Sequence, residues 1–152
     1  MKKKIGLGLL VIVIGIQFIR PAKNLSAATP GPNDITVQHP TSPEVKAVLA
    51  KACYDCHSDN TRYPWYAEVQ PVGWWLANHV KDGKRHLNFS QFGTYTAKRA
   101  GKKLKDVVEE TKEKKMPMSS YTLIHTDAKL TPAEIAAVTA WAESVRATIP
   151  AP

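Results

Sequence analysis

Cys53-Tyr54-Asp55-Cys56-His57 is the most informative segment of this chain. It contains the only two cysteines, which are separated by two residues and followed at once by a histidine. This spacing is typical of c-type haem attachment. Two thiols about one helical turn apart can each add to a vinyl group of the same porphyrin, and the adjacent imidazole is then placed to bind the iron. The sequence therefore predicts one covalent haem c on Cys53 and Cys56, with His57 as the proximal iron ligand.

Other roles for the two cysteines explain this segment less well. A thioredoxin-like dithiol is expected near a βαβ pattern, and the sequence has no strand pattern of comparable quality. A structural zinc site needs four ligands, commonly from two separated pairs, and no second cysteine pair exists. A chance placement leaves the position of His57 unexplained. We therefore interpret the segment as a haem attachment site.

The segments before and after this motif carry the clearest helix signals. Ser42 as N-cap and Pro43 at the first helical position begin a helix that leads into Cys53. Near the end of the chain, Thr131 and Glu134 have the spacing of a capping box, and apolar residues recur behind them at helical intervals.

Two further helices are expected between these. One runs from about 72 to 81 and is stopped by Gly83, because glycine is typical of helix ends. The other runs from about 102 to 115 and is ended by Pro117, because the residue before a proline is pushed out of the helical region. The predicted fold class is mostly α, a small cytochrome c-like helical domain around one haem.

The sixth iron ligand is expected to be Met or a second His. Met116 is the leading candidate because it follows a helix and precedes Pro117, which stiffens the loop. A lone Met is more often core filler and a lone His more often a surface or core side chain, but a haem gives one of them a specific role. The remaining candidates are Met118, His79, His86, His39 and His125.

Four more side chains are candidates for contact with the haem. Trp65 and Trp75 belong to an aromatic-rich stretch that is better interpreted as haem packing and core than as a redox relay. Arg62 and Arg85 are candidates for charge-assisted hydrogen bonds to the haem propionates, although a solvated basic surface explains them equally well.

The first residues have the composition of a targeting segment. Lys2, Lys3 and Lys4 precede the run 5–19, which is apolar or glycine except for Gln17. As a helix, 15 residues rise only about 22 Å, short of the roughly 30 Å hydrocarbon core, so a cleaved signal and a retained anchor both stay open. The lysines predict that the domain lies across the membrane, in the periplasm. The expected division is a signal or anchor over 1–23, a Pro-rich linker over 24–41 and a haem-binding domain over 42–150.

The charge of the chain is concentrated at its start. The whole sequence has a net charge of +8, but residues 1–28 hold five basic side chains and no acidic one. The remainder has 16 basic and 13 acidic side chains, which does not suggest a nucleic-acid partner. The run 98–115 has eight basic and four acidic residues, most simply the wet face of a helix. An acidic redox partner protein is the sharper interpretation of this run.

Taken in order, these segments resemble a known family. The order of an N-terminal helix, the motif 53–57, Met116-Pro117 and a final helix resembles small class I cytochromes c. The stretches 17–21, 62–66, 85–90 and 116–118 look like the bacterial haem-binding domain family. This resemblance implies terminal helices packed beside the haem and a Met in the loop ahead of the last helix as distal ligand.

The expected function is electron transfer by a membrane-tethered monohaem cytochrome, which needs no substrate chemistry. The alternative is a haem-based ligand sensor or a peroxidase with an open or displaceable distal site. His79 and His86 favour this alternative, because a peroxidase needs an acid-base group near the iron. Met116 favours electron transfer.

Overall fold

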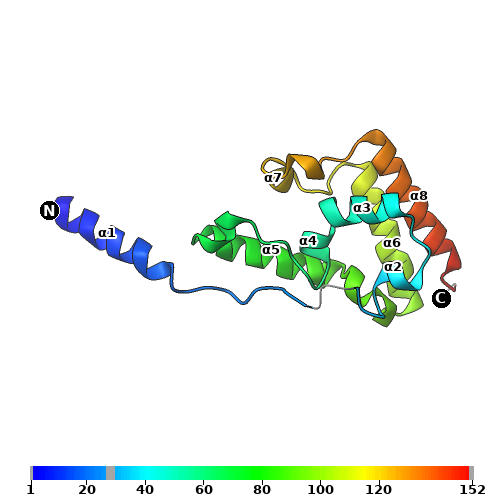
Figure 1. Ribbon diagram of the computed structural model, residues 1–152, viewed down its shortest axis with the longest axis horizontal. Coiled ribbons are helices and arrows are strands. Elements are labelled where there is room, and N and C mark those ends of the chain that lie inside the picture. The colour runs from blue at the N-terminus through cyan, green and yellow to red at the C-terminus, as the bar shows by residue number, and fades with distance from the viewer. Residues whose placement is uncertain (1, 27–29, 151–152) are drawn as a thin grey trace.

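The computed structural model describes residues 2–26 and 30–150, and over these residues the chain is mostly helical and contains no strand (Figure 1). The predicted fold class is therefore confirmed at the level of a small, mostly α domain. The elements, with η for a 3-10 helix, are α1 (Lys2–Ile16), α2 (Ile35–Gln38), α3 (Pro43–Ala52), α4 (Tyr54–His57), η1 (Trp65–Glu68), α5 (Val72–His86), η2 (Phe89–Thr94), α6 (Ala97–Lys112), α7 (Ser119–Thr122), η3 (Thr126–Ala128) and α8 (Pro132–Thr148).

The core forms where α6 packs along α8 and α3 packs on α8. Both predicted helix starts are confirmed. The Ser42 hydroxyl accepts a hydrogen bond from the Val45 N–H, and Thr131 and Glu134 form the complete capping box. The side chains buried in this core are Ile35, Val45, Val48, Leu49, Leu87, Phe89, Phe92, Ala100, Leu104, Val108, Val138, Trp141, Ala142 and Val145. Because α3 leads directly into α4, this packing also fixes the segment 53–57.

The second predicted helix continues past its expected end. Gly83 was expected to stop it, but α5 runs to His86, and Gly83 lies inside the helix. A Cβ atom at Gly83 would lie 2.5 Å from the backbone oxygen of Cys56. The glycine therefore serves the close approach of α5 to α4, which a single sequence does not distinguish from a helix end.

The third predicted helix begins earlier and ends earlier than expected. The Thr96 hydroxyl caps α6 by accepting a hydrogen bond from the Arg99 N–H. The helix ends at Lys112, and Lys114 then adopts a left-handed conformation with φ of 56°. The chain leaves the helix at this turn, ahead of Pro117, and continues to Met116.

Part of the predicted linker belongs to the packed domain. Asp34 caps α2, and the Ile35 side chain is fully buried in the core. Composition predicted a tether over 24–41 because this stretch is rich in Pro, Thr and Asn, but these residues do not prevent a short capped helix. Residues 27–29 of that stretch lie outside the described residues.

The first helix, α1, stands away from the rest of the molecule (Figure 1). Its apolar side chains are exposed, and none of its residues is buried. Over the residues described, no helix has both the length and the apolar character expected of a membrane span.

Candidate functional site

A cavity of about 310 Å³ lies between α4, α5 and the segment that follows α6. It collects side chains from parts of the chain that are far apart in sequence. Its lining residues are Ala52, Cys53, Asp55, Cys56, His57, His79, Asp82, Gly83, His86, Met116, Pro117, Met118 and Tyr121. Both cysteines, the adjacent histidine and both candidate methionines therefore face one space.

The two cysteines lie at either end of the first turn of α4. Cys53 ends α3 and precedes α4, and Cys56 lies within α4. Both are free thiols. Burial raises the pKa of Cys53 to about 12, and burial together with the Asp55 charge raises that of Cys56 to about 11. A redox-active dithiol needs a lowered pKa, so this environment disfavours a thioredoxin-like role.

The His57 ring is oriented by the backbone. Its Nδ1 atom lies 3.0 Å from the carbonyl oxygen of Leu87, the residue that caps the end of α5. Burial lowers the pKa of His57, so the neutral imidazole is favoured. With Nδ1–H donating to this carbonyl, the lone pair is on Nε2, as an iron ligand requires. The local chemistry of His57 therefore fits a proximal haem ligand.

Met116 reaches the cavity from the chain reversal after α6. Its N–H donates a hydrogen bond of 3.1 Å to the Glu110 carbonyl, and its side chain is 38% exposed. Met118, His79 and His86 line the same cavity. His39 and His125 are not among its lining residues, because His39 packs on Phe92 and His125 stacks on Tyr121. The candidates for the sixth ligand are thus reduced, and Met116 stays a prediction among the four that line the cavity.

Asp55 organises a hydrogen-bond network that the sequence reasoning missed. Its carboxylate accepts two bonds of 3.0 Å from the Arg62 guanidinium and one of 2.7 Å from the Tyr121 hydroxyl. Asp55 is buried, and Tyr121 belongs to α7, which directly follows Met118. The network therefore fastens the segment that follows Met118 to the segment 53–57. Only tertiary contacts reveal it, because 66 residues separate Asp55 from Tyr121.

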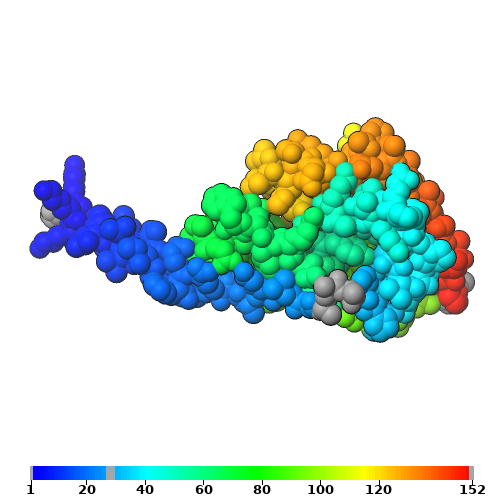
Figure 2. Space-filling view, in the orientation of Figure 1, coloured from blue at the N-terminus to red at the C-terminus, as the bar shows by residue number. Residues whose placement is uncertain are grey.

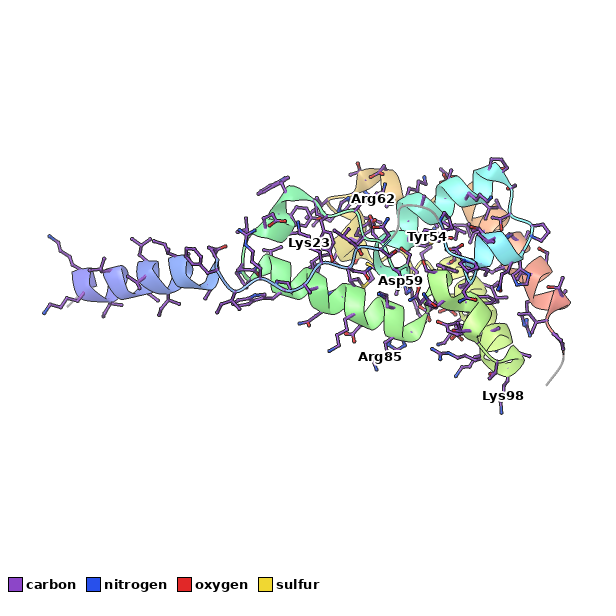
Figure 3. All side chains as sticks on the ribbon, turned by 60° about the horizontal axis from the view of Figure 1, so that its bottom comes forward. Lys23, Tyr54, Asp59, Arg62, Arg85 and Lys98 are labelled. Atoms are coloured by element: carbon purple, nitrogen blue, oxygen red, sulfur yellow. The ribbon has the colours of Figure 1, made fainter. Side chains whose placement is uncertain are left out.

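The remaining predicted site residues do not line this cavity. Arg62 pairs with Asp55, whereas Arg85 is 67% exposed and pairs with Asp82. Figure 3 shows that the two arginines lie in separate parts of the molecule. Trp65 is 80% exposed, and its ring packs edge-on against Tyr66. Trp75 is 48% exposed, with its ring 4.1 Å from that of His79. Their predicted contacts with haem and its propionates stay predictions.

A small helical domain in which two cysteines, a half-buried histidine and two methionines line the same cavity has the donor set of a haem protein. A comparison with protein families agrees. The family model described as a haem-binding domain matches residues 11–144, and the chain belongs to this haem-binding domain family. No curated protein and no solved structure matches the chain.

Proposed function

We propose that this protein attaches one haem c covalently through Cys53 and Cys56 and works as an electron-transfer protein. One observation supports the proposal above the others. The two cysteines, the imidazole of His57 and the thioether of Met116 line a single cavity. In this proposal His57 and Met116 would hold the haem iron.

The residues of the chain have separate tasks in this proposal. The cysteines hold the cofactor, and the Leu87 carbonyl keeps the His57 ring in one tautomer and orientation. The bound haem supplies an iron that exchanges one electron at a time. Ligation by the Met116 thioether raises the potential relative to two histidines. The Asp55–Tyr121 bond holds the segment after Met116 in place, so that this ligand needs little rearrangement.

We place the domain in the periplasm, tethered to the inner membrane by the N-terminal segment. Lys2, Lys3 and Lys4 precede the apolar residues of α1, and such an excess of basic residues marks the cytoplasmic end of a membrane segment. The redox partners are proteins, and an acidic surface on one of them would match the basic residues of α6. Part of that basic face is already paired within the helix, for example Lys105 with Glu109 at 3.2 Å.

The absorption spectrum of the full chain, matured with periplasmic haem attachment, tests this proposal. We expect a low-spin six-coordinate iron with the weak red-edge band of Met-to-ferric ligation. Met116→Ala should abolish that band, whereas Met118→Ala, a change at the same cavity, should leave it intact. Loss of the band only in Met118→Ala would assign the ligand to Met118, and a haem extractable with acidic solvent would contradict covalent attachment.

A second function is favoured by the two histidines of α5. His79 and His86 line the same cavity as His57, at positions from which an acid-base group could act near a vacant iron site. A ligand sensor or peroxidase with an open distal site would give a high-spin, five-coordinate spectrum. The same spectrum would then shift on addition of carbon monoxide or peroxide.

A further inference from the structure

The residues that follow α1, numbers 17–24, are bound to the surface of the domain, and we call them the docking segment. Gln17 and Gln70 exchange two hydrogen bonds: the Gln70 N–H donates to Gln17 Oε1 at 2.9 Å, and Gln17 Nε2 donates to the Gln70 carbonyl at 3.2 Å. Two residues further on, the Ile19 carbonyl accepts a bond of 2.7 Å from the indole N–H of Trp74. The start of the docking segment is therefore fixed against the beginning of α5.

Charged and polar contacts hold the rest of the docking segment. Glu68 of η1 pairs with both Arg20 and Lys23, the latter at 2.6 Å, and these pairs lower the pKa of Glu68. Asn24 is the best-bonded residue of the segment. It bonds to Ser58, Thr61, Tyr63 and Lys84, and its carbonyl also accepts from the Thr61 N–H. A flexible tether would not make contacts along its whole length, so the segment is part of the folded domain.

Exposed apolar side chains belong to the docking segment and to the residues beside its contacts on η1 and the start of α5. Phe18 is 82% exposed and Ile19 is 62% exposed. Val69, directly after Glu68, is 45% exposed, and Trp65 at the start of η1 is 80% exposed. In the space-filling view this narrow end of the domain lies next to α1 (Figure 2). Phe18 and Ile19 also follow the apolar helix within three residues of its end.

We propose that this end of the domain, with Phe18, Ile19, Trp65 and Val69, is seated in the interface of a phospholipid bilayer. The proposal rests on the membrane tether proposed above. It replaces a domain that swings on a flexible linker with one that is held in a fixed orientation at the membrane surface. It also implies that α1 is retained, because cleavage behind the apolar run would remove residues that the domain binds.

Three observations identify lipid as the occupant of this surface. The surface adjoins α1, which behind Lys2, Lys3 and Lys4 carries only apolar residues and glycine on all its sides and has no buried residue, as suits contact with lipid. The apolar run 5–19 would rise only about 22 Å even if all of it were helical, short of the roughly 30 Å hydrocarbon core, so a crossing would bring the residues that follow α1 close to the bilayer. Finally, an exposed tryptophan such as Trp65 is typical of membrane interfaces.

Photocrosslinking of the full chain in vesicles tests whether this end of the domain lies in the bilayer interface. The haem-loaded protein is reconstituted into vesicles of phosphatidylethanolamine and phosphatidylglycerol, with a benzophenone amino acid in place of Val69. A matched control carries the same group in place of Val37, an apolar residue of α2 that is 57% exposed and far from α1 in the fold (Figure 1). We expect lipid adducts from position 69 at several times the yield from position 37.

A double variant tests the contact with lipid separately from the membrane tether. Gln17→Ala combined with Glu68→Ala removes contacts of the docking segment and should lower the lipid adduct at position 69 at least threefold, while the protein still floats with the vesicles. If the protein floats with the vesicles but gives equal, low adduct yields at positions 69 and 37, the proposed contact with lipid is wrong and the membrane tether is supported. Adducts at 69 to a second copy of the chain would also overturn the contact with lipid. Failure to float would show that the tether itself is wrong, and the contact with lipid with it.

Discussion

Asp55 lies between the two cysteines, and its carboxylate connects the attachment motif to Arg62 and to Tyr121 of α7. The proposed haem attachment needs only the cysteines and the histidine, so it does not require a carboxylate at position 55. Here the side chain is buried and all its contacts lie outside the motif. One residue thereby links the segment of the two cysteines to the segment that follows Met118.

Tyr121→Phe is expected to lower the free energy of unfolding by about 1 kcal/mol, because one hydrogen bond to the buried carboxylate is lost. It should also weaken the red-edge Met band on mild heating, since the segment after Met116 is less firmly held. Tyr95→Phe provides the control, because its hydroxyl accepts a 2.8 Å bond from the Asn88 N–H away from the cavity. It should cost similar stability and leave the band unchanged. Equal effects of both changes on the band would contradict the role of Tyr121.

At Gly83 the backbone of α5 comes close to the backbone of α4, beside the cavity. Gly83→Ala places a methyl group 2.5 Å from the Cys56 carbonyl oxygen, so α5 and α4 must move apart. We expect a loss of about 1–3 kcal/mol in unfolding free energy, from the strain of overpacking. Gly101→Ala in α6 is the control, since nothing lies within 4 Å of its added Cβ, and alanine favours helix by up to about 1 kcal/mol. Denaturant titration of both variants checks the opposite signs.

The capping box at the start of α8 makes stability depend on pH. The hydrogen bond from Lys51 and the bond from the Thr131 N–H lower the pKa of Glu134. A lowered folded-state pKa gives stability that is present above the ordinary glutamate pKa and is lost as the pH falls through the lowered value. Glu134→Gln should therefore be less stable than the parent at pH 7, by a few tenths to about 1 kcal/mol at this surface pair. The difference should disappear in acid.

Thermal unfolding at a series of pH values measures this difference. Glu143→Gln removes an exposed ion pair with Lys112 and should change stability little at any pH. A Glu134→Gln penalty that persists unchanged in acid would show that the contribution of Glu134 does not come from its charge.

The positions of the main helices could be predicted from local sequence signals, whereas the contacts between the helices could not. Caps such as Ser42 and Thr131 are local signals, so the starts of α3 and α8 were predictable. Gly83 and Asp55 act through partners distant in sequence, and no local pattern reports such partners. Composition also misjudged residues 34–38, because Ile35 is buried by packing that a Pro-rich context does not reveal.

At the scale of the whole molecule, the docking segment links the N-terminal helix to the haem domain. A chain that starts at residue 17 should therefore be more stable than one that starts at residue 30, by at least about 1 kcal/mol, because several hydrogen bonds depend on the segment. Asn24 alone contacts four other residues. Equal melting temperatures of the two chains would contradict a structural role for these residues.

The two ends of α5 have different attachments. Near its start Trp74 holds the docking segment, and just past its end the Leu87 carbonyl faces His57. A helix of 15 residues is about 22 Å long, so α5 sets the distance between the docking segment and His57. In the proposed orientation at the membrane, the length of α5 limits how far the haem iron lies from the lipid surface. It thereby limits which membrane-bound donors lie within tunnelling range.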